Sequence, residues 1–253
     1  HLQDEPPQMD YYMAVIDIED YLQRNDSVDY YVQRAVREFP DNPVLYIRKA
    51  NRQYGKGNLH GAIESFNRAM LITESDTLRG ELWGYIGDTY HAMGEAVRTK
   101  TDTTEYKIKI KPKKAAQLCY EAYEKALEIH YDNASVLNNY AYFLSEEERD
   151  LGKALEMSSK AIKLTQNNST FLDTHAWILY LLDRKEEART FMRQALSLDT
   201  HCDTPMKFDQ KIRFDKRDPR ILVDLHKMTE GHLDSTIMVA YLRQEERDAA
   251  SLD

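Results

Sequence analysis

The 253-residue chain is poor in cysteine, in proline and glycine, and in long apolar runs. Its two cysteines, Cys119 and Cys202, offer neither a disulfide framework nor the ligand spacing of a zinc site. Nine glycines and seven prolines suit helices joined by short turns. The longest apolar run, residues 176–182, is far shorter than the ~20 residues that a membrane helix needs. We therefore expect an all-α protein without a membrane span.

Positive charge is also scarce, since 34 Lys and Arg face 43 Asp and Glu and leave a formal charge of −9. Phosphate binding depends on basic side chains, so we expect no nucleic-acid partner. The eight histidines are scattered without metal-site spacing, and no serine-centred nucleophile motif is present. We expect no metal, no cofactor and no enzyme activity.

What the chain does have is a recurring pattern of small residues. Five alanines follow one another at separations of 34, 57, 35 and 34 residues: Ala35, Ala69, Ala126, Ala161 and Ala195. Two further small residues precede each of the last four, the second of them seven positions before the alanine: Ala50 and Ala62, Gly87 and Cys119, Ala141 and Ala154, Ala176 and Ala188. Seven is a helical spacing, and small residues are needed where helix axes cross about 8–10 Å apart. Each unit therefore predicts two packed helices.

A 34-residue period of helix–turn–helix units resembles the tetratricopeptide repeat. The signature positions of that family hold Leu172, Ala176, Ala188, Met192 and Ala195 in the last unit, and Trp83, Gly87, Tyr90 and Gly94 in an earlier one. Two features depart from the pattern: Ser158 stands where a large residue is usual, and the proline expected five residues after the late alanine occurs only as Pro40. The resemblance covers roughly residues 10–200 and implies a right-handed superhelix of helix pairs.

The repeat register also predicts the organisation of the chain. Residues 1–8 are expected to be a flexible lead-in and residues 200–253 a connector with C-terminal capping helices. The array between them comprises a degenerate unit and four repeats, at residues 9–41, 42–75, 76–132, 133–167 and 168–199. Since the chain begins at His1, we expect it to be processed or cut from a longer protein. The compartment stays open: the bacterial cytoplasm, or the periplasm or envelope if an export signal was removed.

An insertion of about 20 residues, at 95–114, interrupts the second full repeat. Between Arg98 and Lys114 the chain holds seven basic and two acidic residues. The segment Tyr106–Lys111 alternates with period 2, which predicts a short hairpin with Thr99–Thr104. The alternative is that the two flanking helices simply continue further and the tip between them is disordered. The lysines of the insertion are solvated or form a secondary contact with an acidic partner or with the acidic body of the chain: Lys107, Lys109 and Lys111.

The resemblance implies that the first helix of each pair lines a concave groove that binds a peptide or a partner protein. The candidate contact residues are Asn51, Tyr54, Asp88, His91, Asn138, Tyr142, Asp173, Trp177 and Tyr180. Trp177 and Tyr180 have a second interpretation, as packing against a neighbouring helix. Some family members clamp a C-terminal carboxylate with basic residues, but Ile47 and Asp173 stand at those positions here, so we do not expect such a clamp.

The function expected from this pattern is a protein-interaction scaffold or adaptor, and a homo-oligomer stays open. The alternative is a regulatory or substrate-docking segment of a larger enzyme or envelope assembly whose active part lies outside this chain.

Overall fold

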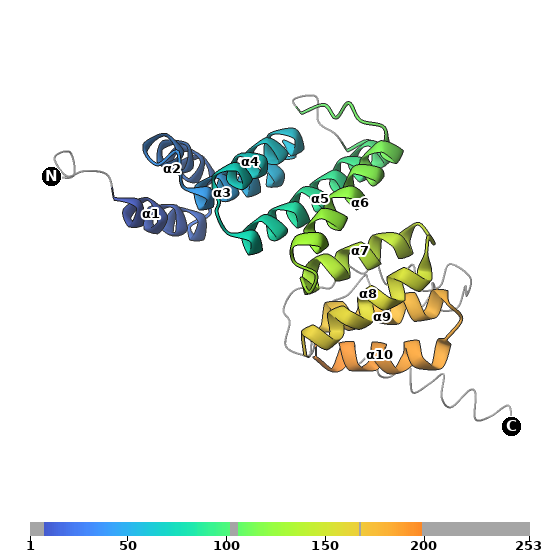
Figure 1. The fold of residues 1–253 in the computed structure, drawn as a ribbon. Helices are drawn as coiled ribbons and strands as arrows, with labels where there is room; N and C mark the ends of the chain where they lie inside the picture. The colour runs from blue at the N-terminus through green and yellow to red at the C-terminus, as the bar shows by residue number, and fades with distance from the viewer. Residues whose placement is uncertain (1–7, 102–105, 167, 199–253) are drawn as a thin grey trace, which may run out of the picture. The chain divides into compact units, whose positions relative to one another are not determined.

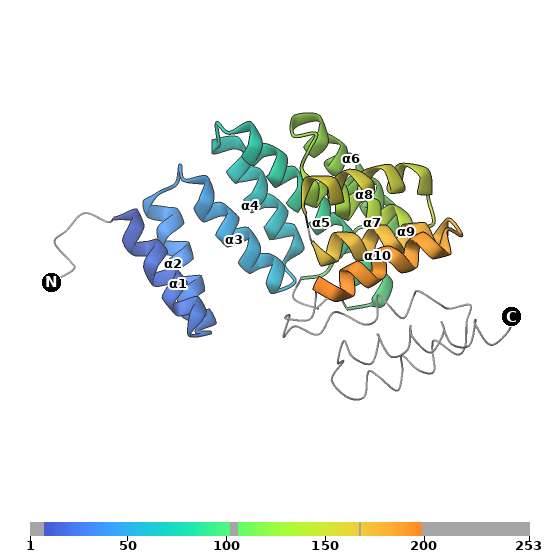
Figure 2. The ribbon, with the colours of Figure 1, turned by 90° about the horizontal axis from the view of Figure 1, so that it is seen from below.

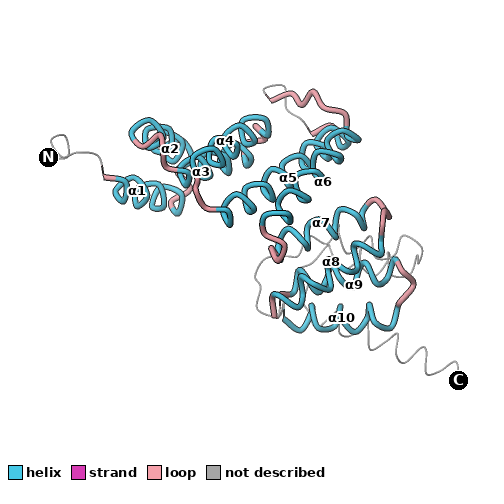
Figure 3. Tube along the Cα trace, in the orientation of Figure 1, coloured by secondary structure: helices cyan, strands magenta, loops and turns pink. Residues whose placement is uncertain are grey.

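The computed structural model describes residues 8–101, 106–166 and 168–198. These residues form ten helices and no strand, which confirms the all-α class (Figures 1 and 3). The chain divides into two compact units, unit 1 at His1–Val136 and unit 2 at Leu137–Asp253. Residues 1–7 of the expected lead-in at 1–8, and the expected connector and capping helices at 200–253, lie outside the described residues.

The described residues of unit 1 form six complete helices: α1 (Met9–Tyr21), α2 (Asn25–Glu38), α3 (Pro43–Gly55), α4 (Leu59–Ile72), α5 (Asp76–Thr99) and α6 (Pro112–Ile129). The next helix, α7 (Ala134–Glu146), starts at the end of unit 1 and lies mostly in unit 2. Unit 2 continues with α8 (Leu151–Leu164), α9 (Ser169–Leu181) and α10 (Lys185–Leu198).

Each helix of unit 1 packs against the next one along the chain, from α1 to α6, and in unit 2 α9 packs against both α8 and α10. Figures 1 and 2 show this order for α3 and α4, which lie side by side in both views. The repeated small residues Ala50, Ala62 and Ala176 lie on these packed helices and are fully buried, as is Ala141 on α7. Contacts between sequence neighbours are what a stacked helical repeat requires.

The same turn joins the two helices of four pairs. After α3, the amide of Gly57 donates to the Tyr54 carbonyl and the amide of Asn58 donates to the Gln53 carbonyl. This is the Schellman arrangement, in which a residue with positive φ satisfies the last carbonyls of a helix. The corresponding positive-φ residues are Gln23 after α1, Glu148 after α7 and Asp183 after α9, each with the same two hydrogen bonds.

Helix α5 has no such turn at the position where the repeat register predicts one. Gly94 is seven residues after Gly87, as Gly57 is after Ala50, yet α5 continues to Thr99 and ends at Lys100, whose φ is 56°. A Cβ on Gly94 would lie 3.4 Å from the Ala115 Cβ of α6, so the two lengthened helices approach closely. Part of the expected insertion is therefore helix, as the second interpretation of that segment predicts.

The alternating segment Tyr106–Lys111 forms no strand, so the hairpin expectation is wrong for these residues; residues 102–105 lie outside the described part. Its alternation has another cause. Ile108 is buried with Leu59 and Met93, and Ile110 packs against the same cluster. The period of 2 therefore places two isoleucines against the helices and the intervening lysines in solvent.

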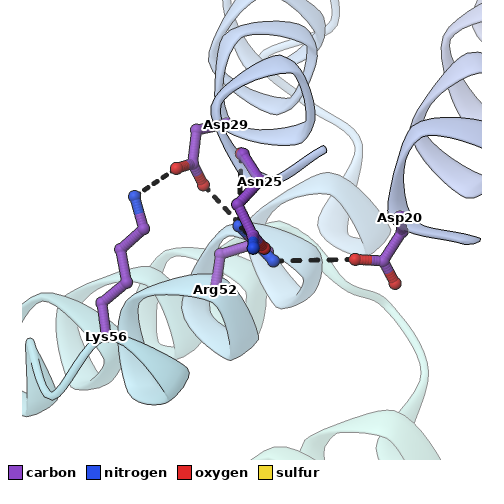
Figure 4. Close-up of polar contacts among 5 residues, drawn as sticks. All are labelled: Asp20, Asn25, Asp29, Arg52 and Lys56. Atoms are coloured by element: carbon purple, nitrogen blue, oxygen red, sulfur yellow. Dashed lines mark hydrogen bonds and ion pairs between the residues drawn. The ribbon is translucent and has the colours of Figure 1, made fainter. Parts of the chain in front are cut away.

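A polar cluster ties the end of α1 and the start of α2 to α3 (Figure 4). The Arg52 guanidinium donates to Asp29 Oδ1 at 3.1 Å and to Asn25 Oδ1 at 2.9 Å, and its Nη1 lies 3.6 Å from Asp20. Lys56 also bonds Asp29. Partial burial opposes ionisation of Asp29, but the hydrogen bonds from Lys56 and Arg52 outweigh it and lower the pKa of the carboxyl. The degenerate first unit is thus fixed to the first full repeat.

Candidate functional site

In each unit, the first helices of the pairs carry side chains that follow the buried small residues by one or four positions and are not part of the core. We call the side of these helices that carries them the first-helix face. In unit 1 it carries Asn51 and Tyr54 on α3 and Asp88 and His91 on α5, which follow the buried Ala50 and Gly87 by one and four residues. Asn51 and Tyr54 are exposed, whereas Asp88 and His91 are half-buried. Helical geometry thus keeps these four side chains beside the helix crossing but out of the core.

Asp88 is the centre of the unit 1 face. Its carboxylate accepts a hydrogen bond from the Tyr123 hydroxyl of α6. Burial raises the pKa of Tyr54 and the charge of Asp88 raises it further. Burial also raises the pKa of Tyr85, with contributions from Glu81 and Asp88. A negative charge therefore lies among three phenols, two of which are 41% exposed.

Tyr85 and Glu81 were not among the candidates from the sequence. The helical spacing of Glu81, Tyr85 and Asp88 at i, i+4 and i+7 is the signal that identifies them, because it places all three on one face of α5. The Tyr85 ring also stacks on the buried Phe66, with centroids 5.5 Å apart. This contact holds the exposed ring in a fixed position.

His91 belongs to a charged row further along α5. Its Nε2 lies 3.9 Å from Glu95 Oε1, and Glu95 also pairs with Arg98. These contacts lie close to the basic segment after α5.

In unit 2 the first-helix face is aromatic. Trp177 and Tyr180 of α9 are half-buried, and their rings stack with centroids 5.9 Å apart and an interplanar angle of 17°. Tyr142 of α7 is half-buried and meets Phe143 edge-to-face at 5.5 Å. Asp173 is half-buried on α9. Two rings stacked on each other form a rigid surface of the kind found at binding hot spots.

Asn138 differs from the expectation of a contact residue. Its side chain is buried, with 3% of the residue exposed, and its Nδ2 donates to Asn139 Oδ1 at 3.3 Å. The residue three positions before the small Ala141 faces inward here. We therefore exclude Asn138 from the candidate face.

The three lysines of the expected secondary contact are all exposed: Lys107, Lys109 and Lys111. They alternate with Ile108 and Ile110, which anchor the segment on α5 and the N-terminal part of α4. The residues between α5 and α6 that carry these lysines are thus packed against the helices of unit 1.

His175, in the interior of unit 2, is a titratable residue that the sequence did not single out. It is 5% exposed, its Nδ1 is 2.8 Å from Ser158 Oγ, and its ring meets Phe191 edge-to-face at 4.6 Å. Burial, aided by the charge of Arg184 and opposed by Glu187, lowers the pKa of His175 from 6.5 to about 4. Such a histidine is neutral near pH 7 and serves packing.

Among the described residues, no group of three or more His, Cys, Asp or Glu side chains is arranged to hold a metal ion. In the same part of the chain, none of the helices combines the length and the apolar character that crossing a membrane requires. Cys119 is buried.

Comparison with known proteins places the fold. Residues 171–202 match the family model described as tetratricopeptide repeat. A 65-residue segment is 37% identical to the TPR repeat-containing protein PA4667 of Pseudomonas aeruginosa, covering 26% of this chain and 11% of that protein. The chain thus matches only about a tenth of the length of that relative.

Solved structures of low sequence identity share the architecture. The thermophilic TPR protein TTC0263 of Thermus thermophilus matches with a TM-score of 0.58 and 16% identity, over 82% of this chain and 97% of that one. MamA from Desulfovibrio magneticus RS-1 matches with a TM-score of 0.53 and 12% identity, over 78% and 97%. The assembly chaperone of RpL4 matches with a TM-score of 0.54 and 13% identity, over 96% and 100%. The chain therefore carries a tetratricopeptide repeat at 171–202 and has the fold of tetratricopeptide repeat proteins, as its small-residue spacing predicts.

Proposed function

We propose that the chain is a protein-interaction scaffold that binds a peptide or a partner protein on its first-helix faces. The observation that carries this proposal is the character of those faces. Aromatic and acidic side chains lie there next to the helix crossings, and they are exposed or half-buried. Stacked helix pairs offer such surfaces for recognition. We propose no catalytic role for the chain.

The unit 1 face suits a basic side chain of the partner. Asp88 supplies the negative charge, and the exposed rings of Tyr54 and Tyr85 supply aromatic surface. A lysine or arginine between two such rings gains cation–π contact as well as ion pairing. Glu81 adds a second carboxylate near Tyr85. We infer that the partner presents a cationic residue here.

The unit 2 face suits an apolar or aromatic side chain. The stacked Trp177 and Tyr180 lose little conformational freedom on binding, because they already hold each other in place. Asp173 on the same helix disfavours an anion at this face. A C-terminal carboxylate is therefore a poor ligand for it, in agreement with the absence of basic residues at the clamp positions Ile47 and Asp173.

The proposal is tested by selecting ligands from a random peptide library on the purified chain and measuring their affinity by titration calorimetry. We expect selected peptides to carry Lys or Arg together with an apolar residue. Asp88→Asn keeps an acceptor for the Tyr123 hydroxyl but removes the charge, and it should weaken a basic ligand roughly tenfold. Trp177→Ala combined with Tyr142→Ala should weaken an apolar ligand roughly a hundredfold.

Leu71→Ala is the matched control, because Leu71 is 80% exposed on the second helix α4. Circular dichroism verifies that each variant keeps its helical content. Affinities that are unchanged by the face variants, or lowered as much by Leu71→Ala, would reject the first-helix faces as the binding surface.

A further inference from the structure

The segment Tyr106–Lys111, which we call the lysine segment, has the side-chain pattern of a β-strand without a neighbouring strand in the described part of the chain. Ile108 and Ile110 pack on the helices, whereas the alternating Lys107, Lys109 and Lys111 are exposed. Successive side chains that point to opposite sides are the mark of extended backbone, and residues 107–109 show this pattern between bends at Tyr106 and Ile110. Lys111 has extended angles, with φ −75° and ψ 139°.

The middle of the lysine segment, residues 107–110, has main-chain groups without a hydrogen-bond partner in the described part of the chain. Within the described residues, no hydrogen bond involves the amide or carbonyl groups of residues 107–110, although Ile108 is 8% exposed. The next residue, Lys111, does have partners, since its carbonyl accepts from Lys114 and Ala115 at the start of α6. A row of unpaired main-chain groups at a protein surface is a template for a further strand.

The positive charge of the lysine segment indicates which kind of strand could pair with it. The lysine segment contributes three lysines, and Lys113 and Lys114 follow directly, in a chain whose formal charge is −9. Among the described residues no ion pair involves Lys107, Lys109 or Lys111. Each of these lysines is exposed on the side opposite the isoleucines. A strand paired to this segment would place its own alternate side chains beside them, and acidic side chains fit best.

We propose that the lysine segment binds an extended acidic peptide by main-chain pairing, forming a two-stranded sheet on the surface of unit 1. The peptide carries Asp or Glu at alternate positions and apolar residues between them. Its acids lie beside Lys107, Lys109 and Lys111, and its apolar residues extend the cluster around Ile108. This is recognition by β-augmentation, in which the backbone gives affinity and the alternate side chains give specificity.

A phosphate-bearing surface would use the lysines but not the backbone. Nucleic acid or an anionic membrane satisfies the ammonium groups by charge alone and leaves the amides of residues 107–110 open to exchange with water. Main-chain pairing is therefore the property that separates the proposed peptide from these two other anions.

The direct test uses the full chain and a short synthetic peptide in which glutamate and valine alternate. Amide hydrogen exchange is measured by NMR with and without the peptide. In a strand, the amides of alternate residues point to the same edge. We expect slower exchange at either Lys107, Lys109 and Lys111 or at Ile108 and Ile110, and unchanged exchange at the other set. Binding without alternating protection would overturn the proposal.

Two N-methylated versions of the peptide test the backbone with the charge held constant. One is methylated at its glutamate amides and the other at its valine amides. Only one of the two sets can face the lysine segment, so one version should lose binding at least tenfold and the other should keep it. Equal affinity for both versions would show an electrostatic contact without pairing and would overturn the proposal.

Charge variants complete the experiment. Changing Lys107, Lys109 and Lys111 together to Gln should raise the dissociation constant roughly tenfold at low salt, because three exposed ion pairs are lost. The matched control changes Lys113 and Lys114 to Gln, which removes charge from α6 and not from the segment, and should have the smaller effect. Vesicles of phosphatidylserine and phosphatidylcholine serve as a competing probe. Binding to the vesicles but not to the peptide would overturn the proposal in favour of a membrane, and either result leaves the first-helix faces untouched.

Discussion

Two helix crossings, one in each unit, differ in the size of the residue at the same repeat position. Tyr123 and Ser158 both lie three residues before the late alanine of their repeat. In unit 1 the position holds the large Tyr123, which is fully buried, and the facing residue is Gly87. In unit 2 it holds the small Ser158, and the ring of His175 from the next helix is bonded to it.

The difference shows that these repeats hold the volume at a crossing constant and not the identity of each residue. A Cβ on Gly87 would lie only 2.7 Å from Tyr123 Cε1, so glycine is the residue that leaves room for the ring. Ser158 leaves room that His175 occupies, and Phe191 packs against the imidazole. Close packing explains both pairs, since a void and an overlap are each destabilising.

The largest loss of stability is expected when the buried Tyr123 ring is removed from the helix crossing of unit 1. Tyr123→Ala removes a fully buried ring and leaves a cavity beside Gly87, which should lower the free energy of unfolding by about 3–5 kcal/mol. Urea denaturation followed by circular dichroism measures the change. The control is Tyr131→Ala, at a residue 69% exposed, for which we expect less than about 0.5 kcal/mol. Similar losses for both tyrosines would mean that Tyr123 does not fill the crossing.

The buried His175 at the crossing of unit 2 predicts that the stability of the fold depends on pH. The pKa of His175 is lowered from 6.5 to about 4 in the folded chain, so only the unfolded chain takes up a proton between these values. Stability is complete above pH 6.5 and is lost as the pH falls towards 4, by roughly 3 kcal/mol. The measurement is urea denaturation at several pH values, with His175→Gln as the control. If the variant lost as much stability as the parent over this range, the buried neutral imidazole would be contradicted.

Overfilling the first crossing should have a smaller effect. Gly87→Ala places a methyl group against Tyr123 and should cost about 1–3 kcal/mol. Because the two residues share one space, the combination with Tyr123→Leu should cost less than the sum of the single changes. Denaturation of the two single variants and the double variant gives the coupling. Strict additivity would show that Gly87 and Tyr123 do not compensate each other.

The smallest effect is expected from Ser158→Ala. The change keeps most of the volume but removes the hydrogen bond between Ser158 Oγ and His175 Nδ1, which should cost about 1–2 kcal/mol. The pKa of His175, followed by NMR, should stay low because burial is its main cause. A return of that pKa towards 6.5 would instead assign the shift to the serine.

Much of the fold was predictable because it depends on local spacing. The small residues Ala50, Ala141 and Ala176 gave the helix crossings directly, since each repeats at the period of the unit. The compensation at Ser158 was not predictable, because it joins residues 17 positions apart in the sequence, and a serine there looks like a departure until His175 is placed beside it.

The site was predictable in part. The register placed Tyr54, Asp88 and Trp177 beside the crossings, but the burial of Asn138 depends on packing that spacing does not reveal. The lysine segment shows the same limit. Its period of 2 predicts a hairpin strand as one of two interpretations, but Ile108 packs against helices. An alternating pattern shows which side of a segment is apolar and not which element covers that side.

Site-specific photo-crosslinking tests the proposed binding surface most directly. A benzophenone amino acid replaces Tyr54 on α3 or Tyr142 on α7, and in control variants it replaces Leu71 on α4 or Leu164 on α8, which are exposed on second helices. Each variant is irradiated with a peptide selected from the library and analysed by mass spectrometry. We predict adducts at Tyr54 or Tyr142 and none at the two leucine positions. Adducts at Leu71 or Leu164 alone would contradict recognition through the first-helix faces.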